Sequence, residues 1–157
     1  MKIKIKKLSE RAILPKKATE GSAAYDLYIP EDIKVEEGRQ IIKLNFAIEV
    51  PEGYEAKIEP RSGYSSKGIK GFIRVFYENA PKEATRRFDC DVLVGKIDSD
   101  YRGEVGVIVH NQDVPFYIHR GQRIAQMTIY KVENVEFLES ETLSDTERGD
   151  GGFGHTG

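Results

Sequence analysis

Charged and apolar residues alternate along much of this chain, and no other sequence feature limits its fold so strongly. Residues 2–8 alternate in this way, which is the pattern of a β-strand with one face toward solvent. Similar runs, separated by turn-forming residues, follow at 41–50, 54–58, 72–77, 91–97, 105–109 and 123–130. Residues 63–68 are predicted to form at most one helical turn. Many short strands with regular turns predict an all-β, antiparallel jelly roll or sandwich.

The composition limits the class of protein. At 157 residues the chain is long enough for one domain with its own core. Its one cysteine, Cys90, excludes an internal disulfide and favours a reducing compartment. With 24 basic and 26 acidic residues the net charge is -2, so we expect no binding to nucleic acid. No apolar stretch approaches the length of a membrane span or a signal peptide. We therefore expect a soluble, cytoplasmic protein with no membrane partner.

The character of the chain changes at residue 139. Residues 139–157 are rich in acidic, hydroxyl and glycine residues, and such a segment does not order itself. We therefore predict one domain over residues 1–138 and a flexible C-terminal tail over residues 139–157. Within the domain, residues 70–89 are predicted to form a hairpin, with a strand at 72–77, a turn at 79–81 and a charged run at 82–87.

The segment 97–103 places Asp98 and Tyr101 between two strand-like runs. Aspartate, serine and glycine are turn formers, so an ordinary hairpin loop explains the segment. The alternative is a carboxylate and an aromatic ring at the mouth of a pocket, because an ionised aspartate can act as a general base toward water. From this segment alone the loop is favoured.

The segment 60–68 contains the parts of a phosphate site. Arg61 offers a guanidinium, Ser62 a hydroxyl, and Gly63 a backbone that can approach an anion closely. A short helix beginning here would add N–H groups directed at a phosphate. The GxxxxGK[ST] spacing of a P-loop is absent. A capped turn between two strands explains the same residues equally well.

Two further segments carry candidate residues. In 120–127 a turn leads into a strand with Arg123 and Gln126, which strand parity places on opposite faces. An ordinary strand with an exposed arginine is the alternative. In the tail, Arg148 offers a partner for phosphate and Phe153 a ring that could stack on a base. A disordered terminus is the alternative there.

Taken together and in this order, the segments resemble the signature motifs of the trimeric dUTPase family. The matching residues are Ala-Ala-Tyr-Asp-Leu at 23–27, Pro-Arg-Ser-Gly at 60–63, Gly-Lys-Ile-Asp-Ser-Asp-Tyr-Arg-Gly at 95–103, Gly-Gln-Arg-Ile-Ala-Gln at 121–126 and Arg-Gly-Asp-Gly-Gly-Phe-Gly-His-Thr-Gly at 148–157. The resemblance implies a jelly-roll homotrimer with active sites at subunit interfaces. It also implies hydrolysis of dUTP to dUMP and pyrophosphate, which keeps uracil out of DNA and supplies dUMP for thymidylate synthesis.

The resemblance further implies roles for individual residues. Asp98 is expected to deprotonate the water that attacks the α-phosphorus, with Gln126 near that water. Tyr101 is expected to pack under the deoxyribose. Asp26 is expected to contact Mg²⁺ through water, the metal being carried by the triphosphate. The other residues expected to bind substrate are Arg61, Ser62, Gly63, Val94, Gly106, Arg148, Phe153, Gly154 and Thr156.

The chain departs from the family pattern at a few positions. Ala24 stands where glycine is common, Gln122 where an acidic residue is usual, and His155 where serine is common. Gln122 puts a local salt bridge of Arg123 in doubt. The stretch 70–89 is longer than the family usually shows, and it is either a surface insertion or a site for a protein partner.

Two other functions are compatible with such a fold. A dCTP deaminase, a relative on the same fold, would need a deaminating acid–base set, and we find no dedicated glutamate motif. A dUTPase-fold regulatory protein would act by binding a protein partner, which the insertion allows. Hydrolysis of dUTP is the favoured interpretation.

Overall fold

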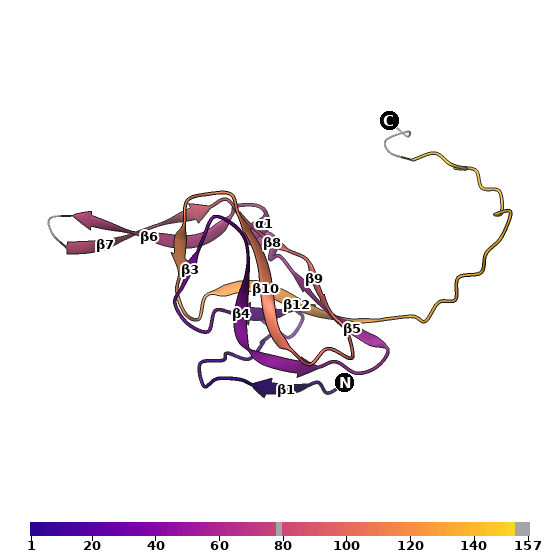
Figure 1. Ribbon diagram of the computed structural model, residues 1–157, viewed down its shortest axis with the longest axis horizontal. Helices are drawn as coiled ribbons and strands as arrows, with labels where there is room; N and C mark the ends of the chain where they lie inside the picture. The colour runs from indigo at the N-terminus through magenta and orange to yellow at the C-terminus, as the bar shows by residue number, and fades with distance from the viewer. Residues whose placement is uncertain (78–79, 153–157) are drawn as a thin grey trace.

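The computed structural model describes residues 1–77 and 80–152. In these residues the strands pair only in the antiparallel sense, and they form three four-stranded sheets around one core (Figure 1). The one helix of the described residues is a single turn. No helix in this part of the chain is long and apolar enough to cross a membrane. The predicted all-β antiparallel fold is therefore confirmed.

The first sheet, called the β4 sheet, has the strand order β1–β4–β10–β8. Its strands are β1 (Lys4–Lys7), β4 (Gly38–Glu49), β10 (Glu104–Asn111) and β8 (Cys90–Leu93). Burial alternates residue by residue along β10, as expected for a strand with one face on the core.

The second sheet, called the β12 sheet, has the strand order β2–β12–β5–β9. Its strands are β2 (Tyr25–Tyr28), β12 (Arg123–Lys131), β5 (Tyr54–Glu59) and β9 (Gly95–Ile97). Only Val94 separates β8 from β9, so the chain passes from the β4 sheet to the β12 sheet without an intervening loop.

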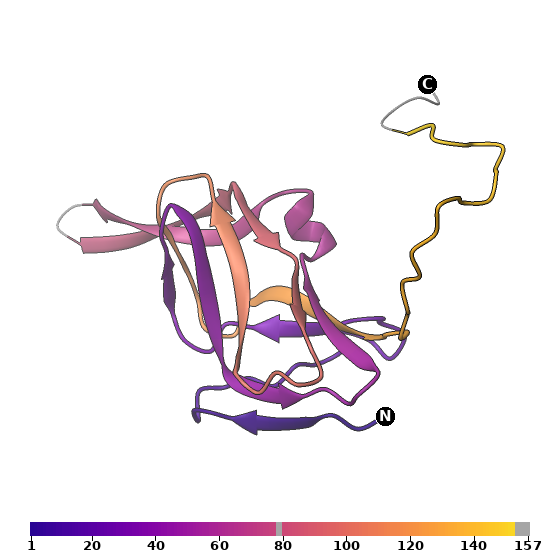
Figure 2. The ribbon, with the colours of Figure 1, turned by 45° about the vertical axis from the view of Figure 1, so that its right-hand side comes forward.

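The third sheet, called the β6 sheet, has the strand order β3–β11–β6–β7. Its strands are β3 (Ile33–Val35), β11 (Phe116–Ile118), β6 (Ile69–Tyr77) and β7 (Ala80–Phe88). β6 and β7 form a hairpin whose far end projects from the body of the molecule (Figures 1 and 2). This hairpin occupies the stretch in which the sequence predicts one, although residues 80 and 81, assigned there to the turn, begin β7 instead.

The core lies between the three sheets. Phe88 and Phe116 stack with their ring centroids 4.1 Å apart and an angle of 6° between the ring planes. Leu27, Ile124 and Val107 are buried beside them. Each side chain of this size contributes about 1.5–3 kcal/mol when it is fully buried. The core thus fixes the sheets relative to one another, and with them the polar residues on their outer faces.

The sequence does not predict three of the strands, namely β2, β3 and β11, and it predicts β7 only as the charged second arm of the hairpin. β3 and β11 have three residues each, too few for an alternation to be recognised. β7 is largely charged, and eight of its nine residues are exposed. β2, β3 and β11 form because their backbone N–H and C=O groups bond to strands distant in the sequence, whereas β7 pairs with the adjacent β6 in the hairpin.

The segment after β12 has a different character. Residues 132–152 contain neither a strand nor a helix, and they run away from the body of the molecule (Figure 1). Large apolar side chains in this segment are exposed, Phe137 to 94% and Leu143 to 90%.

Cys90 is buried at the start of β8. Burial away from water raises the pKa of its thiol to about 12, and the negative charges of Asp91 and Asp89 add to the shift. Because the thiolate is the reactive species, we expect the native protein to resist alkylation at pH 8. Iodoacetamide labelling read by mass spectrometry tests this, with protein in guanidinium chloride as the labelled control. Rapid labelling of the native protein would contradict the buried position.

Candidate active site

The outer face of the β12 sheet carries a row of polar side chains. Asp26 in β2 lies opposite Gln126 in β12, and Gln126 lies opposite Glu59 in β5. Residues that lie opposite each other on paired strands project to the same side of the sheet. The next residues along, Leu27 and Met127, are buried on the core side. The polar row forms the base of the candidate site.

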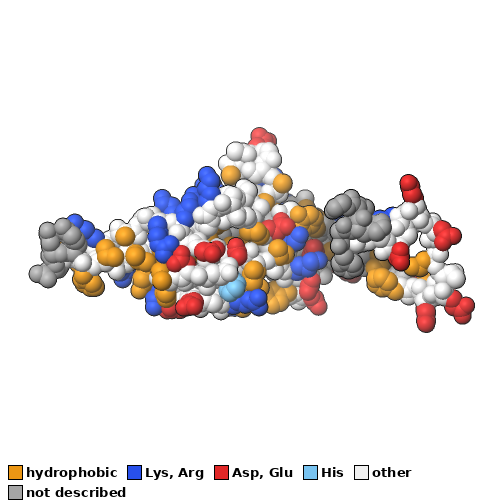
Figure 3. All heavy atoms as spheres, turned by 90° about the horizontal axis from the view of Figure 1, so that it is seen from above, with side chains coloured by type: hydrophobic (Ala, Val, Ile, Leu, Met, Phe, Trp, Pro, Cys, Tyr) orange, Lys and Arg blue, Asp and Glu red, His pale blue; other side chains and the backbone are white. Residues whose placement is uncertain are grey.

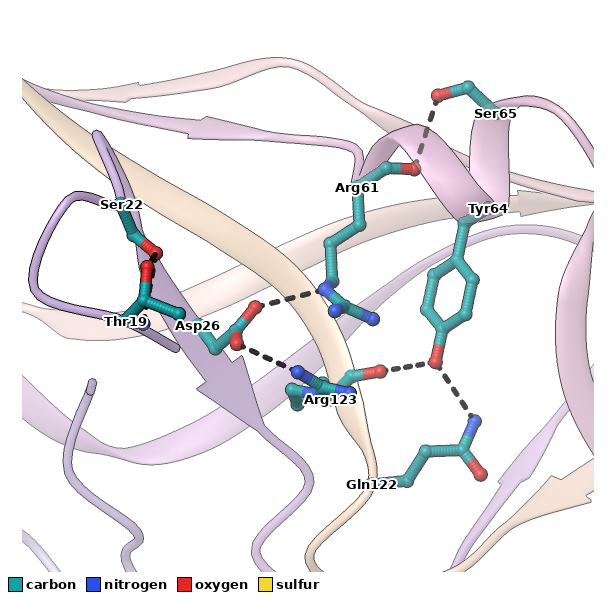
Figure 4. A network of polar contacts seen from close by, with 8 residues as sticks. All are labelled: Thr19, Ser22, Asp26, Arg61, Tyr64, Ser65, Gln122 and Arg123. Atoms are coloured by element: carbon teal, nitrogen blue, oxygen red, sulfur yellow. Dashed lines mark hydrogen bonds and ion pairs between the residues drawn. The ribbon is translucent and has the colours of Figure 1, made fainter. Parts of the chain in front are cut away.

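Asp26 is the centre of a charged cluster (Figure 4). Its Oδ1 accepts a hydrogen bond from Arg61 Nε at 2.9 Å, and its Oδ2 accepts one from Arg123 Nη1 at 3.2 Å. The Asp26 side chain is only 8% exposed, whereas those of Arg61 and Arg123 are 23% and 46% exposed. Charge-assisted bonds to a buried carboxylate fix the position of both guanidinium groups.

Arg123 and Gln126 lie on the same face of β12, not on opposite faces. The register between β12 and β2 shifts between Arg123 and Ala125, and Ile124 and Ala125 are both buried. The irregularity acts as a β-bulge, which adds a residue and reverses the alternation. The parity prediction is therefore wrong, and Arg123 reaches Asp26 as a result.

The segment after β5 forms the short helix α1 (Ser62–Ser65), which overlaps the region 63–68 where a single turn is predicted. The backbone N–H groups of Ser62 and Gly63 have no acceptor within the helix and can bind an anion. The Tyr64 hydroxyl donates to the carbonyl of Arg123, and Gln122 Nε2 donates to that hydroxyl at 3.3 Å (Figure 4). Gln122, which stands where an acidic residue is usual, thus ties α1 to the start of β12.

These residues surround an open pocket of about 680 Å³. Five of the predicted site residues line it, namely Asp26, Arg61, Ser62, Gly63 and Gln126. Guanidinium, hydroxyl and backbone N–H groups that converge on one space are suited to a phosphate. The structure therefore brings together Arg61, Ser62 and Gly63, three of the residues that the sequence predicts to bind phosphate, and places Gln126 beside them.

Asp98 lies outside this pocket. It follows β9 at the edge of the β12 sheet, is exposed, and lines a second pocket of about 560 Å³ with Tyr54 and Glu55. The register places Asp98 two strands across the sheet and four residues along it from Gln126, so their Cα atoms are roughly 16 Å apart. Within one chain, the two side chains cannot contact the same water molecule.

Tyr101 lies in the same loop as Asp98, between β9 and β10. Its backbone N–H donates to the carbonyl of Asp98 at 3.2 Å, and its hydroxyl donates to the carbonyl of Glu104 at 3.1 Å. The ring lies against Gly103, where a Cβ atom would come within 2.3 Å of the Tyr101 hydroxyl. Tyr101 is 44% exposed, so the ring is held over its own loop and remains accessible to a ligand.

Val94 and Gly106 lie where the chain of β8 and β9 separates from β10. β10 pairs with β8 only at residues 108–111, and β9 pairs with β5. Within the described residues, 104–107 therefore have β4 as their only strand partner. Val94 itself is 54% exposed. The backbone at this divergence can offer hydrogen-bonding groups to a planar ligand.

The remaining predicted residues lie in or beyond the C-terminal segment. Arg148 Nε donates to the carbonyl of Gly151 at 2.8 Å, a bond within that segment. The segment runs away from the body of the molecule (Figures 1 and 2). Phe153, Gly154 and Thr156 lie outside the described residues.

The side chains at the site suit a metal ion whose direct ligands come from the substrate and not from the protein. In residues 1–77 and 80–152 no group of three His, Cys, Asp or Glu side chains is arranged to hold a metal ion. Asp26, the predicted contact through water, has both carboxylate oxygens bound to arginines. Mg²⁺ usually keeps several waters and takes its direct ligands from substrate phosphates, and such a mode needs no protein cage.

Arg87 of β7 lines the pocket beside Asp26, although the sequence does not predict it there. Its Nη1 donates to the carbonyl of Gly68 at 2.9 Å. The residue belongs to a charged run without a recognisable motif. Only the pairing of β7 with β6, which places Phe88 opposite Ile69, brings Arg87 beside α1.

Comparison with known proteins agrees with this arrangement. The model of the dUTPase family matches residues 10–75 and 81–157. The deoxyuridine 5'-triphosphate nucleotidohydrolase of Hydrogenobaculum sp. (strain Y04AAS1) is 45% identical over 160 residues, covering 100% of this chain and 99% of that protein. The protein of the same name from Arabidopsis thaliana is 42% identical over 156 residues, covering 98% of this chain and 82% of that protein.

A solved structure extends the likeness to three dimensions. The Staphylococcus bacteriophage 80alpha dUTPase with dUpNHpp matches with a TM-score of 0.78 and 26% identity, covering 99% of this chain and 98% of that one. Together with the antiparallel sheets described above, this likeness confirms the jelly-roll fold. The family model and the relatives span nearly the whole sequence, and the chain therefore belongs to the dUTPase family.

Proposed function

We propose that this protein hydrolyses dUTP to dUMP and pyrophosphate by attack of water on the α-phosphorus. The two relatives are named as nucleotidohydrolases of deoxyuridine 5'-triphosphate, and the 80alpha dUTPase was solved with dUpNHpp. The observation that carries the proposal is the pocket beside Asp26, on which Arg61, Ser62 and Gly63 converge with Gln126.

The pocket beside Asp26 holds the phosphates in this account. Arg61 uses Nε to bind Asp26, which leaves its two Nη groups for phosphate oxygens. The hydroxyl of Ser62 and the backbone N–H groups of Ser62 and Gly63 add further donors. Donors that are already in position when charge develops on the leaving pyrophosphate stabilise the transition state without reorganisation.

Asp98 is the general base. It takes a proton from the attacking water as the new P–O bond forms and the bond to the leaving pyrophosphate breaks. A carboxylate is a weak base, so most of its effect comes from holding the water in line with the α-phosphorus. Gln126 lies near the same water and helps to orient it.

The base and the sugar are recognised beside the loop that carries Asp98. The backbone around Val94 and Gly106, where β9 and β10 diverge, pairs with the edge of uracil. Tyr101 packs under the deoxyribose and leaves no room for a ribose 2′-hydroxyl. The accessible position of its ring supports this role.

The C-terminal residues complete the site when the tail over 139–157 closes. Arg148 binds the terminal phosphates and Phe153 stacks over uracil, with Gly154 and Thr156 beside the substrate. Closure would align the reacting groups and exclude bulk water. The other catalytic and substrate-binding residues belong to the domain of residues 1–138.

The active site is shared between the subunits of a homotrimer. Asp98 and Gln126 of one chain are roughly 16 Å apart by strand register, so two chains must contribute them if both contact the attacking water.

Asp26 would hold Mg²⁺ through water, with the metal carried by the triphosphate. When bound, Mg²⁺ supplies Lewis-acid stabilisation of the phosphate charge.

We expect removal of Mg²⁺ with EDTA to lower the rate of dUTP hydrolysis at least about tenfold. The melting temperature should stay unchanged, because the described residues contain no cluster that could hold a structural metal. A lower melting temperature in EDTA would contradict this account of the metal.

A panel of nucleotides tests the function. The protein is incubated with Mg²⁺ and each of dUTP, dTTP, dCTP and UTP, and release of pyrophosphate and of ammonia is followed. We expect pyrophosphate from dUTP alone. Ammonia from dCTP would indicate the deaminase instead, and dUTP left intact would overturn the proposal.

A second, regulatory function rests on the β6–β7 hairpin. Near its end Phe76 is 82% exposed and Val75 is 39% exposed, and the family model leaves out residues 76–80. Hydrophobic and basic side chains lie along this projecting end (Figure 3). A protein partner could bind here without touching the catalytic residues.

Pull-down with the wild-type protein, Phe76→Ser and Asp98→Asn tests whether the hairpin binds a partner. A partner lost only in Phe76→Ser supports it, and identical profiles would exclude it.

A further inference from the structure

We infer that Arg87 is a further phosphate-binding residue of the active site, which makes the β6–β7 hairpin a part of substrate binding. This inference rests on the proposed function, since the phosphates are those of dUTP. Arg87 belongs to none of the five sequence motifs.

The balance of charge in the phosphate pocket is the first argument. Its charged lining residues are Asp26, Glu59, Arg61 and Arg87, so the formal charges cancel. Arg61 is paired with Asp26 at 2.9 Å, and Glu59 is paired with Lys57 at 2.9 Å. Within the described residues, no carboxylate lies within ion-pair distance of Arg87. Arg87 is thus the one charged lining residue without an ion-pair partner in the described residues, so its whole charge can act on a polyanion beside the Nη groups of Arg61.

The packing at the base of the hairpin is the second argument, because it fixes the position of Arg87. Gly68 has a φ of +74°, and a Cβ atom there would come within 2.3 Å of the carbonyl oxygen of Phe88. The end of the phosphate segment 60–68 therefore lies directly against β7. Arg87 Nη1 donates to the carbonyl of Gly68 at 2.9 Å, which leaves Nε and Nη2 for a phosphate.

The neighbouring Arg86 provides a matched control. Its guanidinium donates to both carboxylate oxygens of Asp113 at 2.8 Å and lies 4.0 Å over the ring of Phe88. The charge of Arg86 is already balanced, and Arg86 does not line the phosphate pocket. Arg86→Gln removes a guanidinium of the same strand without removing the available cation.

The experiment compares Arg87→Gln, Arg87→Lys and Arg86→Gln with the wild-type protein. The KM for dUTP is measured over a range of salt concentrations, and the affinity for magnesium tripolyphosphate is measured by calorimetry. For Arg87→Gln we expect both to weaken about tenfold, the effect of one lost charge-assisted hydrogen bond. The salt dependence should also become shallower, because one fewer cation faces the phosphates. Arg87→Lys should retain part of the affinity, and Arg86→Gln should behave as the wild type.

The two readouts separate this inference from the proposed function. If the wild type does not hydrolyse dUTP, the proposed function fails, and a loss of tripolyphosphate affinity confined to Arg87→Gln still supports Arg87. The inference is overturned if Arg87→Gln keeps its affinity and salt dependence, or if Arg86→Gln loses as much. It is also overturned if the wild-type protein does not bind tripolyphosphate.

Discussion

Replacing Asp98 with asparagine is expected to lower kcat for dUTP by about 10³-fold, within the usual contribution of a general base. Asparagine keeps the size of the side chain and can still hold a water molecule, but it cannot accept a proton from that water. Asp98 is exposed beyond the end of β9 and supports no part of the core, so the fold should be unaffected. Affinity for dUpNHpp, measured by calorimetry, should change little, because the substitution removes the base and leaves the binding groups in place.

Asp100 provides the control for this variant, since it is a second exposed carboxylate in the same loop. Asp100→Asn should keep most of its activity. The assignment of the base would be wrong if Asp98→Asn retained more than about a tenth of the wild-type kcat, below the effect expected of a general base. It would also be wrong if Asp100→Asn lost as much activity as Asp98→Asn.

Two inactive variants are expected to restore each other's activity when they are assembled into one trimer. Asp98→Asn lacks the base, and Arg61→Gln lacks a guanidinium of the phosphate pocket. If each site takes Asp98 from one subunit and Arg61 from another, random assembly of equal amounts gives intact sites in about one quarter of cases. The two chains are co-expressed with different affinity tags. The kcat of the doubly tagged trimers and of the total protein then gives the fraction of intact sites.

A chain that carries both substitutions is the matched control for the mixing experiment. Co-expressed in equal amounts with wild-type chains, it should leave about one quarter of the sites intact if they are shared, and about one half if each site lies within one chain. Failure of the two single variants to restore activity would contradict a shared site. It would then exclude joint action of Asp98 and Gln126 on one water, given their separation in the chain.

Much of the fold follows from local sequence pattern. The strands β4, β5, β10 and β12 are long enough for alternation to show, and the sequence predicts each of them. The strands β2, β3 and β11 are short, and they form because neighbours distant in the sequence satisfy their backbone groups. No local pattern carries that information. β7 belongs to the predicted hairpin, but its largely charged residues do not mark its bounds, which its pairing with β6 defines.

The candidate site was predictable where it depends on motifs and not where it depends on register. Motif resemblance identified Arg61 and Gln126, which line one pocket. Strand parity misplaced Arg123, because a bulge is visible only against the partner strand. The distance between Asp98 and Gln126 depends on the order of strands in the β12 sheet. Arg87 has no motif, and its position depends on the hairpin that packs against Gly68.

Hydrolysis of dUTP in H₂¹⁸O with Mg²⁺ tests the central claim most directly. The products are separated after a single turnover, and the mass of each is measured by mass spectrometry. Attack of water on the α-phosphorus predicts dUMP that carries one ¹⁸O atom and pyrophosphate that carries none. Label in the pyrophosphate, or dUTP recovered unchanged, would contradict the account.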